Sequence, residues 1–248
     1  MSDFARYSRQ VVLREVGVNG QQLLRDSTVL VIGLGGLGSI AAAYLAGAGI
    51  GRLLLCDRDG DRVELSNLQR QLLYRQADVG RAKLDAAVAQ IHALNAGVEV
   101  EARAGEAGLT AVREADIVLD CTDNFPARYA INAACVAAKK PLVSGAAIRF
   151  EGQLALFDLR HGGPCYRCLY ADEGEAAETC EEAGILGPVV GTVGSLQALL
   201  AMKWLLGLRD DAGRLLSWDA RHWHWRTHLM RADPECPVCG VKTLGRST

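Results

Sequence analysis

Two pairs of cysteines have the spacing of a metal site. Cys165 and Cys168 form one C-x-x-C pair, and Cys236 and Cys239 form the other. Four thiolates are the tetrahedral ligand set of a structural Zn²⁺, and a closed set leaves no position for a substrate. We therefore expect these cysteines to bind zinc, to join two distant segments of the chain and to serve stability rather than chemistry; four unliganded thiols are the alternative.

A glycine-rich segment has the spacing of a phosphate-binding loop. It follows the apolar run 28–32, precedes a helical stretch and contains Gly33, Gly35, Gly36 and Gly38. Glycines permit a tight turn and a close approach of backbone N–H groups to phosphate at a helix N-terminus. Asp57 ends the next apolar run, where a partner of the ribose hydroxyls belongs. We expect a nucleotide here; tight packing of helix on sheet is the alternative.

Two cations and an amide follow the acid of the second strand. Asn67, Arg70 and Lys83 would suit a triphosphate, which carries more charge than the pyrophosphate of a dinucleotide and must be held for in-line attack. The alternative is a solvated polar surface.

Asp120, Asp123 and Asn124 come at the end of another buried strand, at the sheet edge where ligands bind in open α/β folds. A carboxylate there would hold Mg²⁺. Capping of the following helix is the alternative for one of the two aspartates.

Other reactive side chains give weaker signals. Cys180 lies in the acidic segment 171–182, which we interpret as a mobile surface loop. A lone exposed cysteine there would act as a nucleophile or a sulfur carrier, although acidic neighbours raise a thiol pKa. Three histidines alternate along a predicted strand, at 222, 224 and 228, and we interpret them as a polar strand face rather than a metal site. The remaining cysteines, at 56, 121 and 135, have apolar neighbours and are expected to be buried thiols.

The elements that would carry these residues alternate between strands and helices. Short apolar runs predict strands at 28–32, 52–56, 98–102, 117–120 and 142–143, and helical spacing covers 39–49, 81–95 and 128–138. This order predicts a Rossmann-like α/β fold whose parallel sheet is covered on both faces. The chain then continues with an antiparallel strand at 152–157, a helix at 193–206 and strands at 215–219 and 222–229. An early amphipathic stretch covers 20–24. We expect one domain over 1–248.

Composition excludes several classes of function. The 248 residues contain 27 Lys and Arg against 29 Asp and Glu, so no overall basic field exists for nucleic acid or an anionic membrane. The uncharged stretches 27–51 and 183–202 are interrupted by glycine or proline, unlike a spanning helix. The charged N-terminus resembles no secretory signal, so we expect a cytoplasmic protein, in which paired cysteines indicate metal or catalysis rather than disulfides.

The combined motifs resemble the MoeB/ThiF/HesA family of E1-like adenylyltransferases, which activate ubiquitin-fold sulfur carriers. The matching segments are RYSRQ at 6–10, GLGGLG at 33–38, LSNLQRQ at 65–71 and DCTDN at 120–124, with the paired cysteines and the loop cysteine. The likeness covers 7–239 and implies the E1/ThiF fold, with a nucleotide-binding half at about 1–150 and a carrier-binding and zinc half at about 151–248. Segments 141–153 and 191–198 look most like the MoeB branch, with ThiF as the runner-up.

The resemblance implies a role for each candidate residue. Asp57 would hold the ribose of ATP and Asp123 would bind Mg²⁺ and be most needed for adenylation. Arg9 would reach the triphosphate from the other subunit of a homodimer. Cys180 matches the loop cysteine that becomes linked to the carrier in the ThiF branch. The remaining nucleotide-binding positions would be Gly33, Gly35, Gly36, Gly38, Asn67, Arg70, Lys83 and Asn124.

The implied reaction joins a protein tail to AMP. The C-terminal Gly-Gly carboxylate of a MoaD-like or ThiS-like carrier would attack the α-phosphorus of ATP and release pyrophosphate, in the molybdenum cofactor or the thiamine pathway. A carboxylate is already deprotonated at neutral pH, so no strong base is needed. A sulfurtransferase or cysteine desulfurase would supply sulfur later. Two alternatives remain: an NAD(P)-dependent oxidoreductase, which leaves Arg70 and Lys83 without a role, and a zinc-stabilised interaction module that does not bind ATP.

Overall fold

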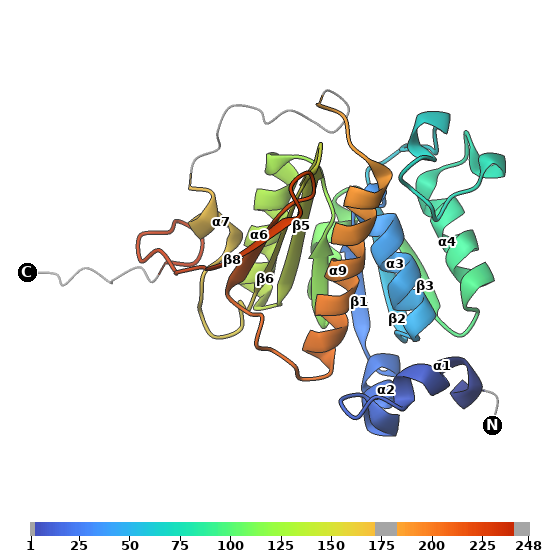
Figure 1. The fold of residues 1–248 in the computed structure, drawn as a ribbon, viewed down its shortest axis with the longest axis horizontal. Helices are drawn as coiled ribbons and strands as arrows, with labels where there is room; N and C mark the ends of the chain where they lie inside the picture. Colours follow the sequence, from blue (N-terminus) through green and yellow to red (C-terminus); the bar gives the residue numbers. More distant parts are fainter. Residues whose placement is uncertain (1–2, 172–182, 241–248) are drawn as a thin grey trace, which may run out of the picture.

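The computed structural model describes residues 3–171 and 183–240, and the strands in these ranges form a single sheet (Figure 1). The strands are β1 (Thr28–Ile32), β2 (Arg52–Asp57), β3 (Glu99–Ala104), β4 (Ile117–Asp120), β5 (Leu142–Ile148), β6 (Glu151–Phe157), β7 (Arg214–Asp219) and β8 (His224–Leu229). Their order in the sheet is β3-β2-β1-β4-β5-β6-β7-β8. Strands β3 to β5 in this order pair in parallel, and β5 to β8 pair antiparallel. The expected parallel sheet with an antiparallel continuation is confirmed.

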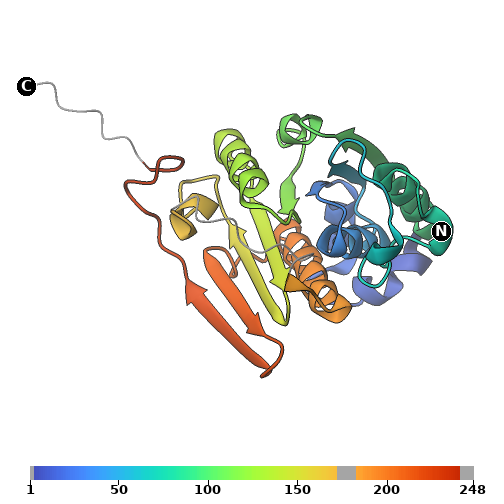
Figure 2. The same ribbon diagram turned by 90° about the horizontal axis from the view of Figure 1, so that it is seen from above.

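Helices cover both faces of the parallel part of the sheet (Figure 2). The helices are α1 (Asp3–Val11), α2 (Gly17–Arg25), α3 (Gly36–Ala48), α4 (Lys83–Leu94), α5 (Ala107–Ala111), α6 (Phe125–Ala138), α7 (Tyr166–Leu169) and α9 (Gly187–Leu205). Alternate residues of β1 divide between two cores. Val29 and Val31 pack on the side of α3 and α9, whereas Leu30 and Ile32 pack on the side of α5 and α6. Because β1 is buried on both faces, consecutive residues of the strand are apolar, which explains the continuous apolar run in the sequence.

Several helices begin earlier than the sequence pattern predicts. Helix α3 begins at Gly36, inside the glycine-rich segment, and α6 begins at Phe125. Helix α9 begins at Gly187 and has Pro188 in its first turn, where the missing N–H group costs no hydrogen bond. Helix α1 was not predicted, and α2 is longer than the amphipathic stretch at 20–24.

The C-terminal hairpin also differs from the prediction. His222 lies in the turn before β8 rather than in the strand, because Trp223 adopts a positive φ of 60°. The side chain of Asp219 accepts backbone N–H groups of Arg221 and His222, both at 3.0 Å, and so fixes the turn. His224 and His228 lie on β8 and are exposed. The polar strand face is therefore confirmed for these two histidines.

Other expectations concern the cysteines and the membrane. The predicted buried thiols, Cys56, Cys121 and Cys135, are buried. Cys180 and nearly all of the acidic segment around it fall outside the described residues. Among the helices of residues 3–171 and 183–240, none combines the length and the apolar composition that a transmembrane helix needs.

Candidate functional site

A cavity of about 1000 Å³ opens at the carboxyl ends of the parallel strands. It lies where the strand order reverses between β1 and β4, which is the usual ligand position in an open α/β sheet. Of the residues predicted to bind nucleotide, those that line this cavity are Gly33, Gly35, Gly36, Asp57, Asn67, Arg70, Lys83, Asp123 and Asn124. The fold thus brings together residues from five separate parts of the chain. Gly38 is not among the lining residues.

The glycine-rich segment forms the floor of the cavity at the start of α3. Gly33 has φ +91°, and a Cβ there would lie 2.8 Å from the carbonyl oxygen of Cys121. A Cβ on Gly38 would lie 1.8 Å from the carbonyl oxygen of Gly33. Gly35 precedes the helix and supplies no side-chain cap, so the first N–H groups of α3 remain available to an anion. Gly38 therefore contributes to the shape of the turn, and its contact with a nucleotide stays a prediction.

Asp57 ends β2 with its carboxylate fixed by the backbone. One oxygen accepts the N–H of Leu34 at 2.9 Å, and the other accepts the N–H of Arg58 at 2.8 Å. Burial raises the pKa of Asp57, while these two N–H groups act in the opposite direction. A carboxylate has about four acceptor positions, so both oxygens retain capacity for hydroxyl donors such as those of ribose.

The cationic wall consists of Lys83 and Arg70. Lys83 is the first residue of α4, is buried, and places Nζ 2.8 Å from a carboxylate oxygen of Asp61. Arg70 donates to the carbonyl oxygen of Ser66 at 3.1 Å. Asn67 is buried and stabilises the turn by accepting the N–H of Glu64 at 3.3 Å. The two cations remain in the cavity wall, so they are in place to neutralise bound phosphates.

The polar side chains at the end of β4 and in the residues after it have three different roles. Asp120 is buried, and its carboxylate accepts the hydroxyl groups of Thr122 at 2.6 Å and Ser144 at 2.9 Å. Asn124 caps α6 by accepting the N–H of Ala127 at 2.9 Å. Asp123 is exposed at the cavity. Its carboxylate accepts the side-chain amide of Asn124 at 3.3 Å and is otherwise open to the cavity, so of the two aspartates it is the better placed to bind a cation. The cap is Asn124 rather than an aspartate.

Arg9 does not join this site within one protomer. Its helix, α1, packs at the opposite edge of the sheet (Figure 1), where Gln10 donates to the carbonyl oxygen of Ala48 at 2.7 Å. Asn95, at the end of α4, donates to the hydroxyl of Tyr7 at 2.8 Å. These two contacts are at the C-terminal ends of α3 and α4, and the N-terminal ends of both helices border the cavity. An approach of Arg9 to the cavity would therefore have to come from a second copy of the chain.

Sequence reasoning missed several residues in the cavity wall. Asp61 and Arg128 line the cavity, as does Gln71, whose buried Oε1 has no hydrogen-bond partner within the described ranges. Gln71 belongs to the same LSNLQRQ segment as Arg70, so this motif could have identified it as a residue of the site. Asp61 and Arg128 had no such signal, because their contacts are with residues distant in sequence or with backbone atoms.

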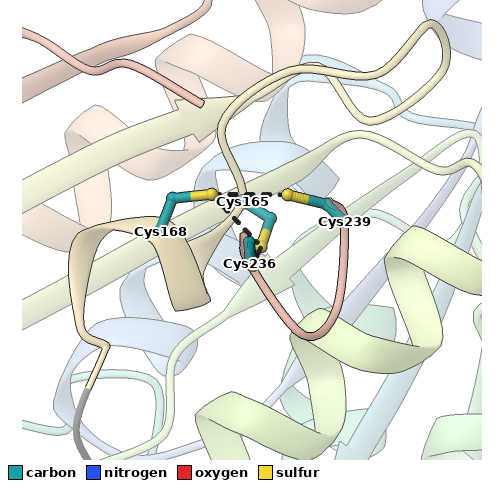
Figure 3. Close-up of side chains that lie close together, drawn as sticks. All are labelled: Cys165, Cys168, Cys236 and Cys239. Atoms are coloured by element: carbon teal, nitrogen blue, oxygen red, sulfur yellow. Dashed lines mark hydrogen bonds between the residues drawn. The ribbon is translucent and has the colours of Figure 1, made fainter. Parts of the chain in front are cut away.

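The four paired cysteines come together in one cluster, with their side chains directed toward one another (Figure 3). Their sulfur atoms all lie within 4.8 Å of one another, with Cys165 and Cys236 3.7 Å apart and Cys168 and Cys239 3.3 Å apart. Tetrahedral coordination with Zn–S bonds of about 2.3 Å separates sulfur atoms by about 3.8 Å. The donor set and its spacing therefore fit zinc.

Hydrogen bonds to sulfur support the same interpretation. Asn132 donates to the Sγ atom of Cys165 at 3.5 Å, and the N–H of Asp233 donates to that of Cys168 at 3.4 Å. Burial raises the pKa of Cys165. At Cys236 burial acts in the same direction, but the backbone N–H groups of Cys239 and Val238 and the side-chain contacts with Cys239 and Cys165 outweigh it and lower the pKa to about 7. Such donors stabilise thiolates, which are the metal-binding form of cysteine.

Comparison with known proteins gives matches along nearly the whole chain. Residues 7–238 match the ThiF family. The chain is 48% identical over 242 residues to the sulfur carrier protein ThiS adenylyltransferase of Escherichia coli (strain K12), covering 96% of each chain. It is 47% identical over 243 residues to the molybdopterin-synthase adenylyltransferase of the same organism, covering 96% of this chain and 97% of that one.

Two further comparisons concern longer proteins. A Sus scrofa protein named adenylyltransferase and sulfurtransferase is 46% identical over 97% of this chain, which spans 54% of its length. Among solved structures, Escherichia coli MccB superposes with a TM-score of 0.82 at 22% identity, covering all of this chain and 75% of that one. This likeness shows the fold of the chain.

Proposed function

Since the chain belongs to the ThiF family and is an adenylyltransferase, we propose that it uses ATP to adenylylate the C-terminal Gly-Gly carboxylate of a ubiquitin-fold sulfur carrier. The observation that carries this proposal is the single cavity that brings the glycine-rich segment, Asp57, Lys83, Arg70 and Asp123 together. The NAD(P)-dependent oxidoreductase gains no support, because the three relatives compared by sequence are named adenylyltransferases.

The carrier is the finer part of the proposal. We propose a MoaD-like carrier of molybdenum cofactor biosynthesis, on the strength of segments 141–153 and 191–198. A ThiS-like carrier of thiamine biosynthesis is the second candidate, because the relatives from the two branches match at 47% and 48% identity. A sulfurtransferase or cysteine desulfurase is the proposed partner for the later sulfur transfer, in which Cys180 would form the covalent link.

The phosphates and the ribose of the nucleotide would be held by different groups. The N-terminus of α3 would bind phosphate through backbone N–H groups, and Asp57 would accept the ribose hydroxyls. Arg70 and Lys83 would lower the charge of the triphosphate, so that the anionic tail of the carrier can approach the α-phosphorus. Alignment of the two reactants is the main requirement, because the attacking carboxylate needs no deprotonation.

Two metal ions complete the proposal. Asp123 would hold Mg²⁺, which supplies positive charge to the phosphates when it is bound. The fitting residue is the exposed carboxylate at the cavity, since the carboxylate of Asp120 is occupied by internal hydrogen bonds. The four cysteines would hold Zn²⁺ in a closed set that joins α7 to the C-terminal segment.

Exchange of labelled pyrophosphate into ATP in the presence of a carrier tests the proposed reaction. We expect exchange with a carrier ending in Gly-Gly, and a loss of about a hundredfold in Asp123→Ala, as when a metal contact in a transition state is removed. Asp210→Ala removes an exposed carboxylate in the loop after α9 and serves as the control. Absence of exchange with both MoaD-like and ThiS-like carriers would overturn the proposal; unchanged exchange in Asp123→Ala would overturn only the assignment of Asp123.

A further inference from the structure

Arg128 is a buried cation that the proposed chemistry does not use. It lies in α6, is 9% exposed and borders the cavity. Its Nη2 atom donates to the carbonyl oxygen of Thr122 at 2.5 Å, and its side chain is hydrogen-bonded to Tyr166. Burial opposes the charged form of Arg128, but the negative charge of Asp120 and the contact with Tyr166 outweigh burial, and the pKa is raised. The guanidinium group is therefore a fixed positive charge.

The contact with Thr122 acts on the backbone beside Asp123. Two other contacts hold the preceding residues: Gln197 on α9 donates to the carbonyl oxygen of Asp120 at 2.8 Å, and the Asp120 carboxylate accepts the N–H of Thr122 at 3.0 Å. Arg128 fixes the carbonyl oxygen of Thr122, which belongs to the same peptide unit as the N–H of Asp123. The direction in which Asp123 enters the cavity thus depends on Arg128.

The other side of Arg128 faces the metal centre. Tyr166 lies in α7 between two of the cysteines, and its backbone N–H donates to the side chain of Asn132 at 2.9 Å. Asn132 in turn donates to the sulfur of Cys165 at 3.5 Å. Arg128 and Asn132 are four residues apart, so they project from the same face of α6. Figure 2 shows the short gold helix α7 beside α6.

We propose that Arg128 is a positioning residue for adenylylation: it orients Asp123 through the carbonyl oxygen of Thr122, and Tyr166 holds the guanidinium group in place. The inference rests on the proposed role of Asp123 in binding Mg²⁺. The cysteine cluster would then affect the cavity as well as stability. Helix α7, between the first two cysteines, carries Tyr166, whose hydroxyl group is hydrogen-bonded to Arg128.

The Mg²⁺ dependence of pyrophosphate exchange tests this role. Arg128→Gln removes a charge-assisted hydrogen bond to the Thr122 carbonyl oxygen, so it should raise the Mg²⁺ concentration for half-maximal exchange on the order of tenfold. The KM for the carrier should change less than about twofold, since no contact with the carrier is removed. Arg128→Lys keeps the charge and should recover part of the loss. Arg113→Gln, which alters an exposed arginine, is the control.

Tyr166→Phe keeps the ring in the core and removes only the hydroxyl group. It should shift the Mg²⁺ requirement in the same direction but by less, because Arg128 still reaches Thr122. This variant keeps the inference falsifiable if Arg128→Gln does not fold. An unchanged Mg²⁺ requirement in both folded variants, with lower unfolding temperatures, would show a structural role only and would overturn the inference. A raised carrier KM at constant Mg²⁺ requirement would also overturn it.

A readout without the carrier separates the inference from the proposed function. Calorimetric titration at several Mg²⁺ concentrations measures how strongly ATP binding depends on Mg²⁺. This dependence should require the same orientation of Asp123. If wild-type protein shows no exchange with any carrier but Arg128→Gln still weakens Mg²⁺-dependent ATP binding, the proposed function fails and the positioning role stands. If ATP binding responds to Mg²⁺ equally in wild type and variant, the positioning role fails.

Discussion

Lys83 borders the cavity with an anionic partner already in contact. Its ammonium group lies 2.8 Å from Asp61, and both side chains are largely removed from water. Breaking a buried ion pair leaves one charge unpaired, whereas an added phosphate would supply a new partner. Asp61 therefore stabilises the free protein and would compete with the proposed triphosphate for the same cation.

This competition predicts opposite effects of Asp61→Asn on stability and on binding. The free energy of unfolding should fall by about 1–3 kcal/mol, because Lys83 loses its counter-charge. ATP should bind several-fold more tightly, since the full charge of Lys83 becomes available and a repelling carboxylate is gone. Urea denaturation and calorimetric titration measure the two effects.

The matched control for this prediction is Asp59→Asn. Asp59 is an exposed carboxylate two residues away and is not among the lining residues of the cavity. It should change neither quantity appreciably. Weaker ATP binding in Asp61→Asn would contradict the prediction and would indicate that Asp61 itself takes part in binding the nucleotide or its cation.

The sequence predicted those candidate residues that lie within a recognisable local motif or directly after an apolar run. Asp57 follows an apolar run and Gly33 follows another, so the strand ends placed both of them at one edge of the sheet. Arg128 and Asp61 could not be identified in this way. The role of Asp61 depends on Lys83, 22 residues away, and that of Arg128 on a backbone carbonyl and on Tyr166. A sequence pattern gives positions along an element, not pairings between elements.

At the level of elements, α3 depends on a turn that tolerates no side chain. A Cβ at Gly38 would lie 1.8 Å from the carbonyl oxygen of Gly33. Gly47 lies in the same helix and is exposed, and a Cβ added there would meet no atom within 4 Å. Substitution of Gly38 therefore tests the steric requirement of the turn, whereas substitution of Gly47 tests helix propensity alone.

Alanine at these two positions should have effects of opposite sign. Gly38→Ala should lower the free energy of unfolding by about 3 kcal/mol and abolish ATP binding, because the backbone of the turn must move. Gly47→Ala should raise the free energy of unfolding by up to about 1 kcal/mol, as alanine favours a helix interior, and should leave ATP binding unchanged. Urea denaturation with ATP titration distinguishes them. Equal stability of the two variants would disprove the steric argument.

The same elements show why helix boundaries were harder to predict than strands. Strands such as β1 and β4 are buried on both faces, so their apolar runs coincide with their ends. Helix α3 begins among glycines, which are poor helix formers, because the turn before it is set by close backbone contacts. Helix α1 has no apolar run of its own, and Tyr7 and Gln10 tie it to residues far along the chain.

Across the whole molecule, α6 contributes to two sites, because Arg128 borders the cavity and Asn132 contacts Cys165 of the cysteine cluster. The cavity is built mostly by residues before 150, with contributions from β6, α7 and α9, and the cysteine cluster is built by residues after 150. The C-x-x-C spacing predicted the cluster itself. Its distance from the cavity depends on the order β4-β5-β6 in the sheet and on the position of α7 against α6, which no motif in the sequence specifies.

The position of Arg9 has a consequence for the whole assembly. Helix α1 lies at the edge of the sheet opposite to the cavity, and the residues that follow Arg9 include Val12 and Leu13, which are 82% and 54% exposed. Such apolar exposure beside α1 favours contact with another protein surface. In the proposed homodimer, Arg9 of one subunit would complete the cavity of the other.

Co-expression of Arg9→Ala and Asp123→Ala chains tests this arrangement. Each variant alone should be inactive in carrier-dependent exchange, because every site then lacks one of the two residues. Random pairing makes half of the dimers mixed, and each mixed dimer has one complete site of two, so the mixture should recover about a quarter of wild-type activity. Co-expression of the double variant with wild type is the control: sites shared between subunits leave only the wild-type dimers active, again about a quarter, whereas sites within one chain leave about half. No recovery in the first mixture and half activity in the second would place Arg9 in the site of its own chain.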